Sequence, residues 1–161
     1  MVVLDTSFVI AALSVEDPFH LESVETLVRL ESQGEIFVIN NFVVAELLTL
    51  ANLRFKSYKA SIVKYTTDLF ENNLHNSIYK FIDEGLFTKS FVLSKESKIS
   101  FTDCTVILTA LQYKSATLLS HDVQLTKMYS NLTLGKAKLS GYLLNDKSTK
   151  QYSANKRKKF S

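Results

Sequence analysis

MVVLD, residues 1–5, is a hydrophobic run that ends in a carboxylate, and it sets the fold class of this chain. Its apolar, β-branched content is typical of a short buried strand. Two further apolar runs, IFVI at 36–39 and ATLL at 116–119, have the same character. Helical patterns separate these runs, and strands that alternate with helices form parallel sheets covered on both faces. The sequence therefore predicts an α/β fold with a central parallel sheet flanked by helices.

The helices expected between the strands follow from apolar spacing and from start and stop residues. Asp17 and Pro18 are the expected N-cap and first residue of one helix, which Gly34 should end. Asn40 or Asn41 should cap the next. Helices are expected over about 17–34, 41–55, 58–72, 83–95 and 100–112, with a helical turn at 123–129. Weaker strand patterns at 77–82 and at GYLLN, residues 141–145, bring the predicted sheet to four or five strands.

Length and composition are those of one ordinary globular domain. The chain has 161 residues, of which 46% are hydrophobic and 22% charged. No apolar run approaches the ~20 residues that a membrane helix needs. The sequence begins directly with a strand pattern and shows no signal peptide, so we expect a cytoplasmic protein with no membrane segment. Cys104 is the one cysteine, which excludes an internal disulfide and a thiolate zinc cluster.

The net charge of +3 is distributed unevenly along the chain. Residues 1–146 hold 13 basic and 16 acidic groups, whereas residues 147–161 hold six basic groups and no acid. We therefore expect one folded domain over 1–146, followed by a basic, disordered tail over 147–161. The tail is either a solvated terminus or an arm that binds phosphate without sequence preference.

Four carboxylates stand inside or at the end of hydrophobic runs. The runs are VVLDTSFVI, VVAELLTL, SFTDCTVILTA and LLSHDVQL, and the acids are Asp5, Glu46, Asp103 and Asp122. None of the runs contains Lys or Arg, although buried carboxylates need a cation or a full set of hydrogen bonds. Strand ends and helix starts converge at the carboxyl edge of a parallel sheet, where ligands bind. A divalent cation from solution is the partner that this pattern favours.

Each acid also has a purely structural alternative. Asp5 and Asp122 could be helix N-caps, and Ser100 with Asp103 matches a capping box. Glu46 fits such an alternative least, because it falls within the apolar arc of its expected helix rather than on the polar face. His121 is expected to be a surface turn residue rather than a phosphate contact. Phe81, Phe87 and Phe91 are expected to be core or dimer contacts rather than surfaces on which bases stack.

If the four acids meet, their mutual repulsion is large. Two unit charges ~4 Å apart repel by roughly 4 kcal/mol at an effective dielectric constant near 20. Such a cluster holds protons or binds a cation. Oxygen ligands without His or Cys favour Mg²⁺ or Mn²⁺ over zinc or copper. Metal-activated water that attacks a phosphodiester is the chemistry expected of such a site.

These motifs resemble those of the PIN-domain family, and in particular its small VapC-type toxin ribonucleases. The similar segments are LDTSFVIAAL, VVAELLTL, SFTDCTVILTALQY and ATLLSHDVQL, in this order across about residues 1–130. The resemblance implies a three-layer, Rossmann-like fold and an endoribonuclease that depends on Mg²⁺ or Mn²⁺. It also implies an RNA substrate, an antitoxin partner and a homodimer formed through apolar helix faces.

The resemblance assigns roles to individual residues. Asp5 and Asp103 would be the principal metal ligands, while Glu46 and Asp122 would complete the site, hold a second metal or orient the attacking water. Ser7 and Ser120 stand beside the acids and would support a carboxylate or a metal-bound water, or serve only as cap and turn residues. Family members often have a second acid after the fourth motif, in D-x-D form, whereas Val123 and Gln124 follow here.

Other classes of protein fit the sequence less well. Haloacid dehalogenase-like phosphatases need D-x-D after the first strand, and Thr6 and Ser7 stand there instead. A metal-ion-dependent adhesion site needs a serine where Val9 stands, and a receiver domain needs paired acids after its first strand. With four glycines the chain has no P-loop or dinucleotide-binding motif. Two alternatives within the family remain, namely a PIN nuclease of RNA processing and an inactive PIN-like module that binds protein.

Overall fold

A four-stranded parallel sheet forms the centre of the molecule. The structure is a computed structural model that describes residues 1–53, 58–70 and 77–134. The strands are β1 (Val2–Leu4), β2 (Phe37–Asn40), β3 (Ser77–Lys80) and β4 (Thr117–Leu119), in the order β3-β2-β1-β4. Val2 is paired with Phe37 on one side and with Thr117 on the other, and all three strand pairs are parallel. The predicted α/β architecture is therefore confirmed.

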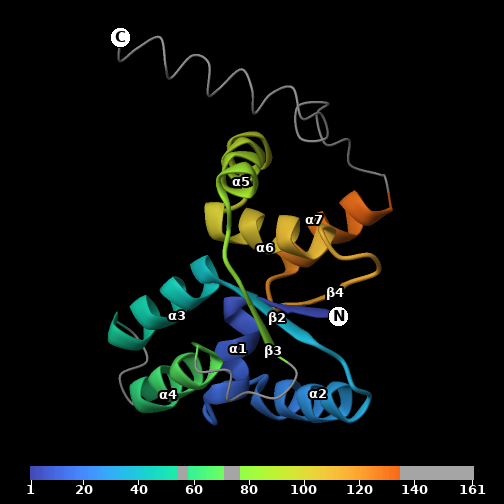
Figure 1. Cartoon of the computed structure of the whole chain (residues 1–161). Helices are drawn as coiled ribbons and strands as arrows, with labels where there is room; N and C mark the ends of the chain where they lie inside the picture. The colour runs from blue at the N-terminus through green and yellow to red at the C-terminus, as the bar shows by residue number, and fades with distance from the viewer. Residues whose placement is uncertain (54–57, 71–76, 135–161) are drawn as a thin grey trace.

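Helices cover both faces of this sheet. They are α1 (Thr6–Leu13), α2 (His20–Ser32), α3 (Asn41–Leu53), α4 (Lys59–Phe70), α5 (Glu84–Ser97), α6 (Phe101–Leu111) and α7 (Val123–Thr133). Figure 1 shows α6 and α7 above the sheet, with α5 packed on α6, and α1, α2 and α4 below it. Every residue of β1 and β2 is buried. This burial explains why the two strands are apolar without polar alternation.

Most predicted elements agree with the structure, and three differ. The helical turn expected over 123–129 is a longer helix, α7, which runs to Thr133. The helix α1 was not predicted, because its residues TSFVIAAL are apolar on all sides and give no helical periodicity. The helix α2 begins at His20 rather than at Pro18. The Asp17 carboxylate accepts a hydrogen bond from the Phe19 backbone N–H at 2.9 Å, so it caps a turn that precedes the helix. At the other end, Gly34 adopts a positive φ of 73°, a conformation that glycine favours.

Several predictions fall outside the described residues. They are the end of the helix expected to reach 55, the end of the helix expected to reach 72, the edge strand at 141–145 and the basic tail at 147–161. Within the described ranges, no helix has the length and apolar character needed to cross a bilayer.

Asn40 joins the end of β2 to two helices. Its side chain is buried, and its Oδ1 accepts hydrogen bonds from the backbone N–H groups of Phe42 and Val43, both at 3.0 Å. Its Nδ2 donates to the hydroxyls of Thr105 and Thr109 on α6, at 3.2 and 3.3 Å. One side chain therefore caps α3 and fixes the start of α3 against α6.

We expect Asn40→Ala to lower the free energy of unfolding by about 2–4 kcal/mol. The change removes an N-cap, worth about 1 kcal/mol, and leaves two buried threonine hydroxyls without their amide partner. Urea unfolding followed by circular dichroism measures the effect. The matched control is Asn52→Ala on the same helix, where the amide is exposed and donates only to Leu48 O. It should change stability by less than about 0.5 kcal/mol. A loss below 1 kcal/mol in Asn40→Ala would contradict this account.

Candidate active site

Asp5 lies at the carboxyl end of β1 and begins the site. Its side chain is buried, at 3% exposure, and caps α1 by accepting a hydrogen bond from the Ser7 backbone N–H at 3.2 Å. The same oxygen, Oδ2, accepts hydrogen bonds from the hydroxyls of Ser7 at 2.7 Å and Ser120 at 2.8 Å. Three donors therefore hold a buried carboxylate that forms no salt bridge with any Lys, Arg or His of the described ranges.

The two serines tie the end of β1 to the turn that follows β4. Their hydroxyls lie 3.1 Å apart. Ser7 Oγ accepts a hydrogen bond from the His121 backbone N–H at 3.0 Å, and Ser120 Oγ accepts one from the Asp122 backbone N–H at 2.9 Å. The serines thus place Asp122 at the same edge of the sheet as Asp5, although 116 positions separate the two in sequence. Asp122 is itself the N-cap of α7, with Oδ1 accepting from the backbone N–H groups of Gln124 and Leu125.

Glu46 reaches this edge from the second turn of α3. It is half-buried, and its Oε2 accepts a hydrogen bond from the Thr6 hydroxyl at 2.6 Å. Thr6 directly follows Asp5, so the hydrogen bond brings Glu46 to the start of α1. Thr6 is not among the site residues predicted from the sequence. Its position between the first acid and Ser7 is the signal that could have indicated this role.

Asp103 lies in the first turn of α6, where the Ser100 hydroxyl caps the helix by accepting from the Asp103 backbone N–H at 3.1 Å. The pKa of Asp103 is raised from its usual value near 4 to about 6, mainly by burial and also by the charges of Asp5, Asp122 and Glu46, against a hydrogen bond from Ser100 that lowers it. The other three acids therefore lie close enough to Asp103 for their charges to disfavour its ionised form.

Comparison with known protein families identifies the family of this chain. A family model for the PIN domain matches residues 2–131. The chain belongs to the PIN-domain family. Among solved structures, VapC20 of Mycobacterium tuberculosis, a toxin that cleaves the sarcin-ricin loop, has the same fold. The TM-score is 0.64 at 18% sequence identity, and the match covers 80% of this chain and 95% of that one. No curated protein sequence matches the chain significantly.

Family membership and the VapC-like fold together support a nuclease of the PIN type. Both expected structural consequences of the resemblance, a parallel sheet and helices on its two faces, are present.

Carboxylate oxygens, such as those of the four acids in this PIN domain, are the ligands that hard cations prefer. Among the described residues, the side-chain hydrogen bonds given above for Asp5, Glu46 and Asp122 each reach a single oxygen of the carboxylate, Oδ2, Oε2 and Oδ1 respectively. The second oxygen of each accepts none of these hydrogen bonds. Within the same ranges, no three His, Cys, Asp or Glu side chains stand close enough together to form a coordination shell as they are. A Mg²⁺ ion held by one or two of these carboxylates would take water or substrate oxygens for the rest of its coordination shell.

His121 corrects one expectation about the surface of this domain. Its ring is half-buried and stacked between Phe8 and Phe19, with centroid distances of 5.4 and 4.4 Å. The ring Nε2 lies 2.7 Å from the hydroxyl of Ser23, a fully buried residue of α2. His121 is therefore not a solvated turn residue. Its backbone supports Ser7 while its ring fastens the turn after β4 to α2.

Proposed function

We propose that this PIN domain is a Mg²⁺- or Mn²⁺-dependent endoribonuclease that hydrolyses RNA phosphodiester bonds. The observation that carries the proposal is the convergence of Asp5, Glu46 and Asp122 at one edge of the sheet, where Thr6 donates to Glu46 and Ser120 links Asp5 to the Asp122 backbone. Among the described residues, the two salt bridges join the Met1 amino group to Glu35 and Lys64 to Asp68, so neither involves these acids. Four coupled carboxylates without a cationic side chain favour a divalent ion as their partner.

We assign the ligand roles as follows. Asp5 and Asp103 are the principal metal ligands, while Glu46 and Asp122 complete the site, hold a second metal or orient the attacking water. Bound Mg²⁺ or Mn²⁺ supplies an activated water and neutralises charge on the phosphate. Ser7 and Ser120 keep the Asp5 carboxylate in a fixed orientation, and the Thr6 hydroxyl does the same for Glu46. Such supporting hydrogen bonds to ligands tune metal sites in general.

The biological role that we propose is that of the toxin in a toxin–antitoxin pair. The fold shared with the toxin VapC20 supports this role. In this role the protein would act on an RNA substrate in the cytoplasm, form a homodimer and bind an antitoxin protein. The proposed domain organisation is a nuclease domain over residues 1–146 and a basic tail over 147–161. Growth arrest on expression, relieved by the product of a neighbouring gene, tests the toxin role. Expression without arrest would favour the alternative of a PIN nuclease in RNA processing.

The nuclease proposal is tested by RNA cleavage with and without metal. Purified protein should cut single-stranded RNA with Mg²⁺ or Mn²⁺ and lose all activity in excess EDTA, with activity returning when the metal is restored. Cleavage that continues in EDTA would rule out the metal centre. A protein that binds RNA or another protein but never cuts would instead support the inactive-module alternative.

Metal binding should also stabilise the fold without any reference to activity. A ligand present at a hundredfold excess over its Kd stabilises the native state by about 2.7 kcal/mol, which raises the Tm by roughly 5–10 °C for a domain of this size. We expect this rise with Mn²⁺ in the wild-type protein and its loss in Asp5→Asn. Differential scanning calorimetry measures it. An equal rise in both proteins would show that the metal binds elsewhere.

A further inference from the structure

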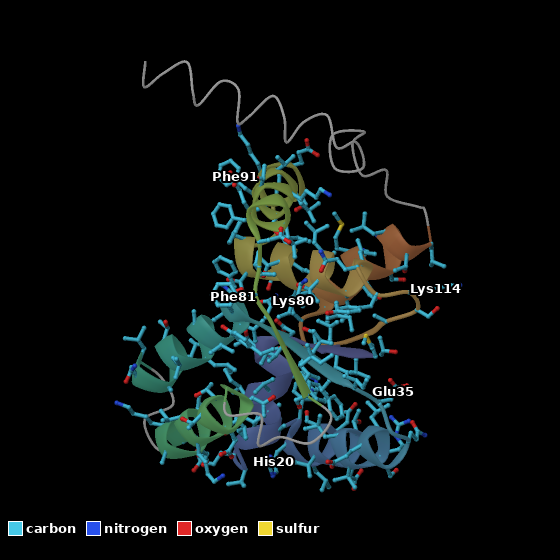
Figure 2. The ribbon with its side chains drawn as sticks, viewed as in Figure 1. His20, Glu35, Lys80, Phe81, Phe91 and Lys114 are labelled. Atoms are coloured by element: carbon cyan, nitrogen blue, oxygen red, sulfur yellow. The ribbon has the colours of Figure 1, made fainter. Side chains whose placement is uncertain are left out.

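Three phenylalanines expose their rings on the β3–α5 side of the molecule. Phe81, Phe87 and Phe91 are 70%, 45% and 48% exposed, so they are not core residues as one reading of the sequence expected. Phe87 and Phe91 lie one turn apart on α5 and therefore share a face of that helix. Figure 2 shows Phe81 and Phe91 on the same side of the molecule. We call these three residues the aromatic row.

The aromatic row is continuous with the edge of the sheet that carries the acids. Phe81 directly follows β3, just as Asp5 directly follows β1 and Ser120 follows β4. Because the strands are parallel, these positions share the carboxyl edge of the sheet. The row therefore begins at the same edge of the sheet as Asp5, two strands away in the order β3-β2-β1-β4.

Ring contacts of Phe87 also link the aromatic row to the helices that carry two of the acids. The Phe87 ring lies 5.0 Å from that of Phe101 and 6.0 Å from that of Phe42, centroid to centroid. Phe101 is two residues before Asp103 on α6, and Phe42 is one helical turn before Glu46 on α3. Phe87 thus rests on the helix starts that present two of the four acids.

The charge distribution directs a polyanion to the aromatic row rather than to the opposite side. Residues 6–45, which include α1 and α2, hold six acids and a single Arg or Lys, namely Arg29. Residues 80–98 hold four lysines, Lys80, Lys89, Lys95 and Lys98, against three acids. Lys80 directly precedes Phe81, and the exposed Lys95 lies one turn beyond Phe91. A nucleic acid that approaches the carboxylates is therefore repelled less along α5 than along α1 and α2.

We propose that Phe81, Phe87 and Phe91 form a platform on which unpaired bases of single-stranded RNA stack beside the cleavage site. The inference rests on the proposed nuclease function and names where its substrate binds. Aromatic rings interleaved with cations are the arrangement that binds single strands without sequence preference, because every base has a π-face. A second copy of this chain is the competing occupant of the row. It fits less well, because a partner seated on the row would also cover the approach to Glu46 and Asp103.

The experiment separates ring stacking from apolar contact. Phe81→Leu and Phe91→Leu keep an apolar side chain but remove the ring, whereas Phe81→Trp and Phe91→Trp keep a larger ring. Each change is made in the Asp5→Asn protein so that the RNA stays intact. Fluorescence anisotropy then measures the affinity for a labelled single-stranded oligoribonucleotide and for the same backbone with its bases removed. The control is Leu21→Ala, which alters an exposed apolar side chain on α2.

We expect each Leu variant to bind the base-bearing RNA about tenfold more weakly, and each Trp variant to bind it at least as tightly as the parent. Affinity for the base-free backbone should not change in any variant, and Leu21→Ala should match the parent with both probes. Equal affinity of parent and Leu variants for the base-bearing RNA would overturn the inference. So would a parent that does not distinguish the two probes, or Leu variants that shift from dimer to monomer in sedimentation.

The two proposals fail in different ways. A wild-type chain that cuts RNA while its Phe→Leu variants bind RNA normally refutes the aromatic row alone. A wild-type chain that never cuts RNA, but whose variants lose base-dependent affinity as expected, refutes the nuclease and leaves the RNA-binding row in place.

Discussion

Asp5→Asn should reduce metal-dependent RNA cleavage by a factor on the order of 10³ or more while leaving the fold intact. The substitution keeps the size of the side chain, and the amide oxygen can still accept hydrogen bonds from the hydroxyls of Ser7 and Ser120. It removes the negative charge that a divalent ion needs, and the loss of one key electrostatic group in an active site commonly costs a factor of 10²–10³ even without loss of a ligand. Initial cleavage rates at saturating Mn²⁺ measure the effect.

The control for this prediction is a carboxylate outside the acid cluster. Asp68 lies on α4 and pairs with Lys64, so Asp68→Asn removes one negative charge without touching the site. It should cut RNA at the wild-type rate. Ser7→Ala and Ser120→Ala should give intermediate rates, because each removes one of the donors that orient Asp5. Wild-type activity in folded Asp5→Asn would remove this residue from the machinery.

Asp103→Asn should also abolish cleavage, and it should stabilise the metal-free protein at neutral pH. The pKa of Asp103 is raised to about 6, first by burial and then by the charges of the other acids, so its ionised form is destabilised in the native state. A shift of this size corresponds to about 3 kcal/mol for a fully buried group. Asp103 is only half-buried, and solvent screening reduces the expected gain to roughly 1 kcal/mol. The corresponding rise in Tm is about 2–4 °C.

The raised pKa of Asp103 determines how the stability difference between Asp103→Asn and the wild type changes with pH. Between the unfolded value near 4 and the folded value near 6, the native state of the wild type binds more protons than the unfolded state. The carboxyl group of Asp103 therefore does not reduce the free energy of unfolding of the wild type below pH 4, and it reduces that free energy progressively as the pH rises through 6. Asp103→Asn should accordingly be more stable than wild type above pH 6, and the difference should disappear below pH 4.

Thermal unfolding of both proteins in excess EDTA, from pH 4 to pH 8, measures this dependence. Asp68→Asn again serves as the control, because Asp68 is not part of the acid cluster. A variant that is less stable than wild type at pH 8 would show that Asp103 stabilises the native state, and the electrostatic account of the cluster would be wrong. Proteins commonly retain residues that destabilise the fold where activity needs them.

The apolar strands and the four acid-bearing runs could be predicted from the sequence because they are local features. The strands within MVVLD and IFVI are buried on both faces, and strands of that kind contain few polar residues, whereas ATLL gives a shorter strand whose Thr117 is exposed. Glu46 stood out for a similar reason, since an acid inside the apolar arc of a helix is visible from a window of about ten residues. The order of these runs also carried the resemblance to the PIN family, which the family match confirms.

Only the tertiary structure shows which side chains hold the acids in place. Thr6 donates to Glu46 across 40 positions, Ser120 to Asp5 across 115, and Asn40 to Thr105 across 65. The stacking of His121 between Phe8 and Phe19 is equally remote in sequence. Hydrophobic periodicity along the sequence shows which face of a helix or strand packs on the core, whereas these contacts depend on how two such elements pack together. The four acids could therefore be predicted from the sequence as candidate cation ligands, whereas their meeting at one edge of the sheet was decided by the packing of the strands and helices that carry them.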